Sequence, residues 1–136
     1  MSEFRWPVRV YYEDTDSGGV VYYANYLKFM ERARTERLRT LGFEQDRLRS
    51  QQGILFTVHS VNIDFLRPAV FNDQLAVTAV IETCKRASLV FSQEVFRQSE
   101  TAPVCRASVR IACVDADHFR PCPIPPAIFK ELAHVN

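Results

Sequence analysis

The residues best suited to catalysis lie in an acidic loop near the N-terminus. Residues 13–19 read Glu-Asp-Thr-Asp-Ser-Gly-Gly, between a short stretch of β-branched and aromatic residues and the longest helical pattern of the chain. A carboxylate in such a loop can attack an electrophilic carbon directly or activate a water molecule. Asp is also common in turns and at helix caps for structural reasons. From residue types alone, Asp14 and Asp16 therefore fit either role.

Backbone N–H groups just after the acidic loop are suited to polarising a carbonyl oxygen. Gly18 and Gly19 close the loop, and a helical pattern begins near Tyr23. The first N–H groups of a helix have no partner inside the helix, and the helix dipole favours negative charge there. A carboxylate beside such donors suits the hydrolysis of an activated carbonyl compound, because the donors stabilise the oxyanion that forms.

One long helix and several strands must position these groups. Between residues 24 and 41 apolar residues recur with a period near 3.6, and Gly42 supplies a stop. After Gly53 the period changes to two, and a change of parity near His59 and Ser60 predicts a β-bulge. The predicted strands cover residues 8–12, 54–65, 75–81, 89–97 and 105–113, and shorter helices are predicted at residues 45–50 and 127–134.

The order of these elements predicts an α+β fold. A strand, a long helix and then four strands place one amphipathic helix against a mainly antiparallel sheet. No internal repeat or low-complexity segment interrupts the 136 residues. We therefore expect residues 1–136 to form a single domain.

Composition and charge exclude several classes of protein. The 17 basic and 16 acidic side chains give a net charge of +1, which is not the basic excess typical of nucleic-acid-binding proteins. No apolar run approaches the roughly 20 residues of a membrane span, and the N-terminus lacks the pattern of a signal peptide. We therefore expect a cytoplasmic protein that binds no nucleic acid and has no membrane span.

The cysteine and histidine residues predict neither a metal nor a redox site. Cys84, Cys105, Cys113 and Cys122 form no C-x-x-C pair, and we interpret them as small apolar side chains. The three histidines are scattered, without the spacing of metal ligands. The chain also lacks a G-x-S-x-G motif, a P-loop and a dinucleotide fingerprint. We expect no metal and no cofactor.

Residues 9–26 resemble the signature of the 4-hydroxybenzoyl-CoA thioesterase family. Residues 27–36 are closer still to one branch, the acyl-CoA thioesterases encoded with the Tol–Pal envelope system. Later segments are also similar, namely residues 65–69 with Asp73 and residues 113–115. The resemblance covers nearly the whole chain, and its first segment is long and specific.

This resemblance implies a hotdog fold, in which a mainly antiparallel five-stranded sheet wraps around the long helix. It also implies a homo-oligomer, either a dimer or a dimer of dimers, with active sites at the subunit interface. The implied substrate is an acyl-CoA, with acyl carrier protein as an alternative acyl donor. Coenzyme A is then part of the substrate rather than a cofactor.

The resemblance also assigns roles to residues of the loop. It makes Asp16 the catalytic carboxylate, as nucleophile or as general base, and gives the backbone N–H of Tyr23 the task of polarising the thioester carbonyl. Gly18 and Gly19 shape the loop, whereas Asp14 keeps its structural interpretation. Many close relatives carry His where this chain has Tyr23. Because a tyrosine, with a pKa of about 10, is a poor base at neutral pH, we expect only its backbone to matter.

Three charged residues outside the loop have open assignments. Glu31 matches a helix glutamate used by another hotdog branch as an auxiliary catalytic group, but it also fits an ion pair with Arg34 or Arg32 on the helix surface. Lys85 and Arg86, in the turn before the fourth strand, match a basic pair that binds the phosphates of coenzyme A in relatives. A basic turn that is merely exposed to solvent is the alternative for them.

The predicted function is hydrolysis of acyl-CoA to a free acid and coenzyme A. One alternative is a non-catalytic acyl-CoA or acyl-ACP binding or scaffold protein, linked to phospholipid metabolism and the Tol–Pal system. The tyrosine at position 23 favours this alternative, and Asp16 argues against it. A second alternative is a hotdog hydratase or dehydratase, which depends on a histidine that this loop and helix lack.

Overall fold

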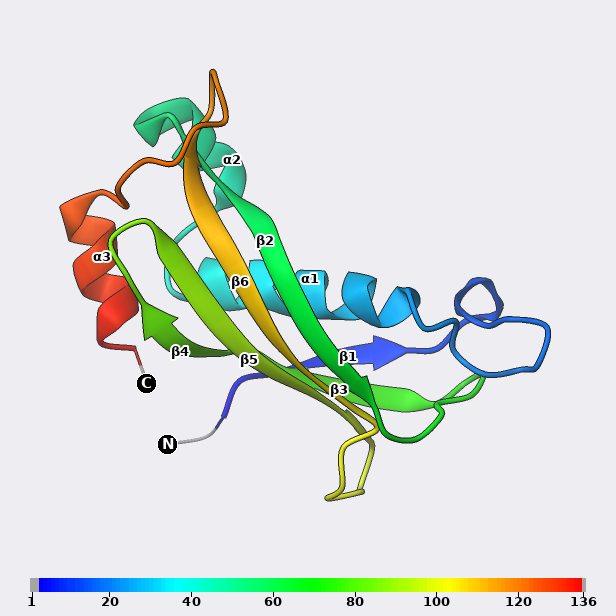
Figure 1. Cartoon of the computed structure of the whole chain (residues 1–136). Coiled ribbons are helices and arrows are strands. Elements are labelled where there is room, and N and C mark those ends of the chain that lie inside the picture. The colour runs from blue at the N-terminus through cyan, green and yellow to red at the C-terminus, as the bar shows by residue number, and fades with distance from the viewer. Residues whose placement is uncertain (1–2, 136) are drawn as a thin grey trace.

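The computed structural model describes residues 3–135, which form a curved antiparallel sheet around a long helix (Figure 1). The strands are β1 (Arg5–Arg9), β2 (Ile54–Phe65), β3 (Gln74–Thr78), β4 (Val80–Cys84), β5 (Ser88–Arg97) and β6 (Cys105–Asp115). The helices are α1 (Asn25–Thr40), α2 (Gln45–Arg47) and α3 (Pro126–Ala133), with a 3-10 turn η1 (Tyr12–Asp14) and a π-helical segment η2 (Leu48–Gln52).

The strand order of the sheet is β1-β3-β5-β6-β2, and β4 also pairs with β5. β3 and β4 lie one after the other along the same side of β5, because β3 pairs with its last residues and β4 with its first. β1 and β2 stand at the two ends of this order. Pro7 fits an edge strand such as β1, since proline has no N–H to give to a second neighbour.

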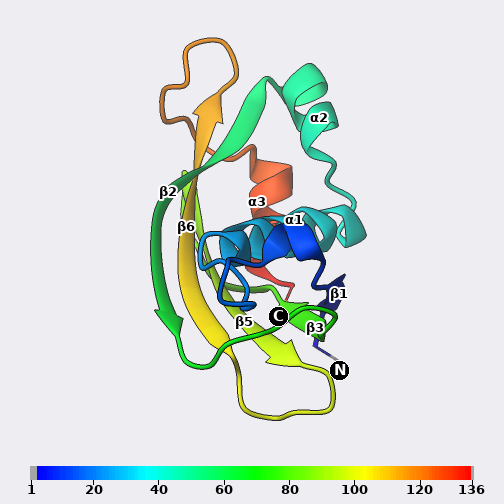
Figure 2. The same cartoon turned by 90° about the vertical axis from the view of Figure 1, so that its right-hand side faces the viewer.

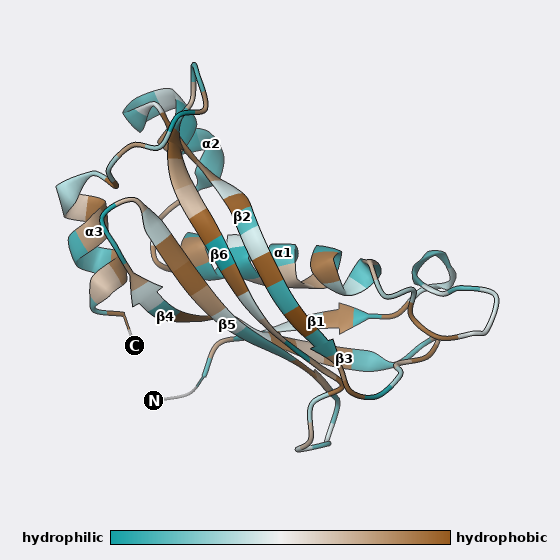
Figure 3. Cartoon of the chain, viewed as in Figure 1, coloured by the Kyte–Doolittle hydropathy of each residue, from teal (hydrophilic) through white to brown (hydrophobic). Residues whose placement is uncertain are grey.

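The concave face of the sheet holds α1, as Figure 2 shows. The buried residues of α1 recur every three or four positions and are mostly apolar, namely Tyr26, Phe29, Met30, Ala33 and Leu38, with the polar side chains of Asn25 and Arg34 among them. Along β2 and β6, apolar and polar residues alternate (Figure 3). The apolar face of β6 is buried in the core, whereas β2 is buried only at Ile54 and leaves Val58, Val61 and Phe65 exposed. Truncating a fully buried aromatic residue such as Phe29 to alanine would cost about 3–5 kcal/mol of stability.

Two predictions about these elements are confirmed. The long helix, predicted for residues 24–41, occupies Asn25–Thr40. The bulge predicted near His59 and Ser60 is present, because the register between β2 and β6 shifts between Val58 and Ser60. The bulge bends β2 so that the strand follows the curvature around α1.

The predicted strand at residues 75–81 is two strands, which makes the sheet six-stranded rather than five-stranded. The break falls at Ala79, next to Thr78, whose hydroxyl and carbonyl both accept hydrogen bonds from residues of β5. The Thr78 hydroxyl accepts from the Glu94 N–H at 2.9 Å, and the Thr78 carbonyl accepts from the Gln93 side chain at 3.1 Å. Side chains thus replace the regular ladder at this point, and a new strand begins at Val80.

The first predicted strand, residues 8–12, is wrong in its bounds. β1 covers Arg5–Arg9 instead, because the chain turns into η1 at Tyr12. Val10 still exchanges two backbone hydrogen bonds with the segment before β3, to Asp73 at 2.9 Å and from Asn72 at 2.8 Å. The acidic loop therefore starts from a backbone anchored to the sheet.

No helix within residues 3–135 combines the length and the hydropathy that crossing a lipid bilayer requires.

Candidate active site

Asp14 holds the acidic loop against the start of α1. Its side chain is buried, and one carboxylate oxygen accepts a hydrogen bond from the Asn25 side chain at 3.0 Å. The other accepts from the Tyr11 N–H at 2.9 Å, and the Asp14 carbonyl accepts from the Tyr22 N–H at 2.8 Å. A buried carboxylate requires such partners. The structural role expected for Asp14 agrees with this geometry.

Asp16 is exposed at the tip of the same loop. Its Oδ1 accepts a hydrogen bond from the Gly18 N–H at 2.8 Å, whereas its Oδ2 receives none from any residue between 3 and 135. The loop closes through the Asp16 N–H, which donates to the Val20 carbonyl at 2.9 Å, and through the Gly19 N–H, which donates to the Asp16 carbonyl at 3.0 Å. The carboxylate is therefore fixed by one oxygen and available through the other.

The two glycines of the loop meet separate requirements. A Cβ atom on Gly18 would lie 3.2 Å from Asp16 Oδ1, closer than an ordinary contact, so a side chain there would press on the carboxylate. Gly19 has a φ of +82°, which disfavours any residue with a Cβ atom. Both features fit the loop-shaping role predicted for this pair.

The backbone N–H of Tyr23 has no acceptor within the described part of the chain, residues 3–135. It lies just before α1, whose N-cap position is Ala24, a residue that cannot cap the helix with its side chain. Alanine at this position costs about 1 kcal/mol relative to Ser, Thr, Asn or Asp. The first three N–H groups of α1 already donate to the carbonyls of Tyr22, Tyr23 and Ala24. The unpaired Tyr23 N–H just before them can therefore stabilise negative charge, together with the helix dipole.

The side chain of Tyr23 is 61% exposed and lies among other aromatic rings. Its ring meets that of Phe65 edge-on, with 5.9 Å between the centroids, and that of Tyr22 at 5.0 Å. Phe65 also contacts Tyr26, at 5.8 Å. These rings form an aromatic cluster at the start of α1.

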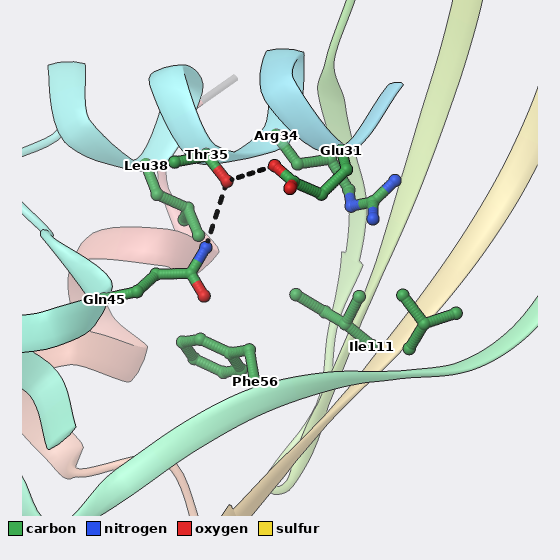
Figure 4. A pocket seen from close by; sticks show the side chains of 8 residues that line it. Glu31, Arg34, Thr35, Leu38, Gln45, Phe56 and Ile111 are labelled. Carbon is green, nitrogen blue, oxygen red and sulfur yellow. Dashed lines mark hydrogen bonds between the residues drawn. The ribbon is translucent and has the colours of Figure 1, made fainter. Parts of the chain in front are cut away.

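Glu31 lines a cavity of about 370 Å³ between α1, α2, β2 and β6, which Figure 4 shows from close by. Its carboxylate accepts a hydrogen bond from the Thr35 hydroxyl at 2.9 Å, and Thr35 in turn accepts from the Gln45 side chain at 3.3 Å. Within residues 3–135, Glu31 forms no ion pair with Arg34 or Arg32; its carboxylate is bonded to Thr35 instead, although its charge acts on the nearby Arg34.

A second hollow of about 640 Å³ adjoins this cavity. The two share Glu31, Arg34 and Val58, and the second is also lined by Leu27 and Val61. Together they form a groove along α1, which we call the α1–β2 groove. The groove starts at Leu27, about one helical turn beyond Tyr23, and neither Tyr23 nor Asp16 lines it.

Arg34 reaches the groove from a buried position. Its guanidinium donates to Gln93 Oε1 at 3.1 Å, and Gln93 Nε2 donates to the carbonyls of Met30 at 3.0 Å and Thr78 at 3.1 Å. Burial lowers the pKa of Arg34 from its usual value, and the nearby Glu31 carboxylate opposes that shift. This network ties α1 to the middle of the sheet.

Lys85 and Arg86 are exposed in the turn between β4 and β5. The Lys85 N–H donates to the Ser88 carbonyl at 2.8 Å, and the Arg86 carbonyl accepts from the Ile124 N–H at 2.8 Å. In Figure 1 this turn lies beside α3, at the opposite end of the sheet from the acidic loop. The structure thus brings Asp16 and Tyr23 into one region of the chain and leaves this basic pair elsewhere.

Two residues of the site were not predicted from the sequence. Asn25 clamps Asp14, and Phe65 packs against Tyr23. The contact between Asn25 and Asp14 has a signal in the sequence, namely an Asn at the start of the helix soon after the acidic loop. The second depends on the path of β2 and leaves no local signal in the sequence. No group of three or more His, Cys, Asp or Glu side chains suited to a metal ion occurs among residues 3–135.

Comparison with known proteins places this chain among thioesterases. Residues 18–104 match the sequence profile of the thioesterase superfamily. The chain is 43% identical over 133 residues to a Haemophilus influenzae protein named acyl-CoA thioesterase YbgC, which covers 98% of this chain and 96% of that protein. A Helicobacter pylori protein of the same name is 36% identical over 131 residues, covering 91% of this chain and 95% of that protein. A crystal structure of a probable thioesterase from Bartonella henselae superimposes with a TM-score of 0.85 at 33% identity, over 91% of this chain and 100% of the other.

Proposed function

Because the chain belongs to the thioesterase superfamily, we propose that it hydrolyses the thioester bond of acyl-CoA substrates, with Asp16 as its catalytic carboxylate. The α+β hotdog fold expected from the sequence is confirmed by the superposition on thioesterase structures. The relatives named acyl-CoA thioesterases share more than a third of their residues with this chain and match nearly its whole length. They support acyl-CoA as the substrate class.

One observation carries the assignment of the site. Among residues 3–135, a carboxylate oxygen without a donor, on Asp16, lies in a short hairpin, and a backbone N–H without an acceptor, on Tyr23, lies two residues after that hairpin. The bridge between Thr15 and Val21 and the hydrogen bond from the Asp16 N–H to the Val20 carbonyl hold that hairpin closed. Hydrolysis of a thioester requires these two functions, one to deliver the attack and one to stabilise the oxyanion.

Asp16 can act by either of two routes. As a general base, it takes a proton from water while the oxygen attacks the thioester carbonyl, the Tyr23 N–H stabilises the oxyanion, and the departing CoA thiolate recovers that proton. As a nucleophile, its oxygen forms an anhydride with the acyl group and releases the thiolate, and water then cleaves the anhydride. Both routes end with a free acid, coenzyme A and an unchanged carboxylate.

The test is thiol release from a panel of acyl-CoAs, from short to long chains and including benzoyl types, by the parent protein and by Asp16→Asn. We expect turnover by the parent and its collapse in the variant, which keeps the shape of the side chain and removes its charge. If neither protein releases thiol while both bind acyl-CoA, the non-catalytic binding role replaces this proposal. Hydration of an enoyl-CoA would favour the hydratase instead.

We propose further that the acyl chain runs from the Tyr23 N–H along the α1–β2 groove. Phe65, which packs against Tyr23, lies on β2, the strand that lines the groove with the apolar side chains of Phe56 and Val58. Val58→Trp should then lower kcat/KM for long-chain acyl-CoAs about tenfold and leave short chains unaffected. The matched control is Ser60→Trp, on the same strand but outside the groove lining. An unchanged chain-length preference in Val58→Trp would rule this binding mode out.

Lys85 and Arg86 fit coenzyme A binding only if a second copy of the chain supplies them. Within one chain they lie far along the sheet from the acidic loop (Figure 1), so our proposal includes a homo-oligomer, a dimer or a dimer of dimers. The exposed edge strand β2, 12 residues long, is available to a partner. Light scattering gives the oligomeric state, and Lys85→Ala with Arg86→Ala should raise KM without lowering kcat.

Other features of the prediction depend on the resemblance alone. Acyl carrier protein carries the acyl group through the same type of thioester, so the panel should include an acyl-ACP. As an auxiliary catalytic group, Glu31 would have to act on the substrate from the lining of the α1–β2 groove, which Asp16 and Tyr23 do not line. The cytoplasmic location and the link to phospholipid metabolism and the Tol–Pal system stay predictions.

A further inference from the structure

Two thiols face each other where β6 leads into the segment before α3. The Sγ atoms of Cys113 and Cys122 are 3.7 Å apart. The Cys122 N–H donates to the Cys113 carbonyl at 3.0 Å, and the neighbouring residues Val114 and Pro121 form an antiparallel bridge. The two cysteines therefore occupy opposite positions on adjacent antiparallel segments.

This arrangement is compatible with a disulfide without refolding of the backbone. Opposite residues of antiparallel segments have Cα atoms about 4.5–5.5 Å apart, within the range of roughly 4.4–6.8 Å that disulfides span. Both cysteines are free thiols in the structure. The two Sγ atoms, 3.7 Å apart, would have to approach to about 2.0 Å, and the spacing of the two segments permits this.

The two thiols differ in their access to solvent. Cys122 is half-buried, whereas Cys113 is fully buried. Burial, and the contact with Cys122, raise the pKa of Cys113 to about 12. An external reagent therefore meets Cys122 first, and Cys113 can react only with the sulfur already beside it.

We propose that Cys113 and Cys122 form a reversible redox-modification site that reacts with small disulfides such as glutathione disulfide. The Cys122 thiolate attacks one sulfur of the reagent, forms a mixed disulfide and releases one thiol. The Cys113 thiol then attacks Cys122 Sγ, gives its proton to the departing sulfur, forms the intrachain disulfide and releases the second thiol. The two protein thiols are oxidised, the reagent is reduced to two thiols, and the two protons lost by the cysteines end on them.

The site is connected to the basic turn between β4 and β5. The Cys113 N–H donates to the Ala87 carbonyl and the Ile124 N–H donates to the Arg86 carbonyl, both at 2.8 Å. A disulfide would fix the segments that hold this turn. If Lys85 and Arg86 bind coenzyme A, which rests on the proposed function, oxidation should change KM for acyl-CoA at least threefold and leave kcat unchanged.

The experiment oxidises the folded protein with glutathione disulfide, unfolds it in the presence of an alkylating reagent, and maps the thiols by peptide mass spectrometry. We expect a peptide pair joined through Cys113 and Cys122, which dithiothreitol separates. Cys84→Ser, the matched control, should form the same link, and Cys122→Ser should form none. Full alkylation of both cysteines after the folded parent protein has been treated with glutathione disulfide, or a link that forms only when the protein is oxidised in urea, would overturn the proposal.

Kinetics of the oxidised protein form a separate measurement. A changed KM that dithiothreitol reverses, and that is absent from Cys122→Ser, supports the connection to the basic turn. An unchanged KM in fully oxidised protein overturns that connection. If the protein forms the disulfide but hydrolyses no acyl-CoA, only the proposed function is contradicted. The redox proposal is unaffected, because the mass spectrum does not depend on turnover.

Discussion

Two polar regions along α1 differ in how completely their hydrogen-bonding groups are paired. At the start of the helix, Asp16 Oδ2 and the Tyr23 N–H have no partner among residues 3–135. In the middle of the helix, Gln93 accepts from Arg34 with its oxygen and donates to the carbonyls of Met30 and Thr78 with its nitrogen. The first region is exposed, and the second is buried.

This difference in pairing distinguishes the candidate site at the start of α1 from the network around Gln93, which supports the structure. A buried polar group is destabilising unless it is paired, so complete pairing around Gln93 is what stability alone requires. Unpaired groups at an uncapped helix start gain nothing for stability, and they are available to a ligand. The comparison predicts that changes in the first region reduce activity and that changes in the second reduce stability.

The largest effect should come from Asp16→Asn. We expect kcat to fall about a thousandfold, because the amide can neither attack a carbonyl nor accept a proton. The free energy of unfolding should change by less than about 0.5 kcal/mol, since the position is exposed and the Asn oxygen can still accept from the Gly18 N–H. Thiol release and urea denaturation measure the two quantities. A large loss of stability with intact activity would reverse the comparison.

Gln93→Leu should break the second region. It leaves the Arg34 guanidinium without its Gln93 partner and removes the donors to Met30 and Thr78, and we expect a loss of about 3 kcal/mol in the free energy of unfolding. Below its unfolding temperature the variant should keep kcat. Gln98→Leu, on the exposed turn after β5, serves as the control with no expected loss. Unchanged stability in Gln93→Leu would show that the network is not the support we describe.

Asp14→Asn sharpens the boundary between the regions, because Asp14 lies two residues from Asp16 and yet is buried and paired. The Asn side chain would place an N–H₂ group against one of two donors, the Tyr11 N–H or the Asn25 side chain. We expect a loss of about 2 kcal/mol in stability. Activity should fall through displacement of the loop, so that lower temperature or a stabilising osmolyte restores part of it. Asp16→Asn should show no such recovery.

The sequence could predict features that depend on local patterns. The long helix follows from an apolar period maintained over several turns, and the bulge follows from one change of parity near Ser60. The break at Ala79 could not be predicted, because it depends on hydrogen bonds between Thr78 and residues of another strand. The juxtaposition of Cys113 and Cys122 likewise could not be predicted, because it depends on the segment after β6 folding back to pair with the end of that strand. The candidate site falls between these cases, since the loop composition left Asp14 and Asp16 equivalent and only the family resemblance separated them.

Tyr23→Phe should have the smallest effect and tests which part of that residue belongs to the site. The substitution keeps the backbone N–H and the ring contacts with Phe65 and Tyr22, and it removes only a hydroxyl with no hydrogen-bond partner among residues 3–135. We therefore expect kcat/KM to stay within about twofold of the parent, as for other exposed substitutions. A fall of a hundredfold or more, measured by thiol release on the best substrate of the panel, would mean that the hydroxyl itself takes part. The unpaired group at the start of α1 would then be a side chain rather than the backbone, and the uncapped Ala24 would lose its functional explanation.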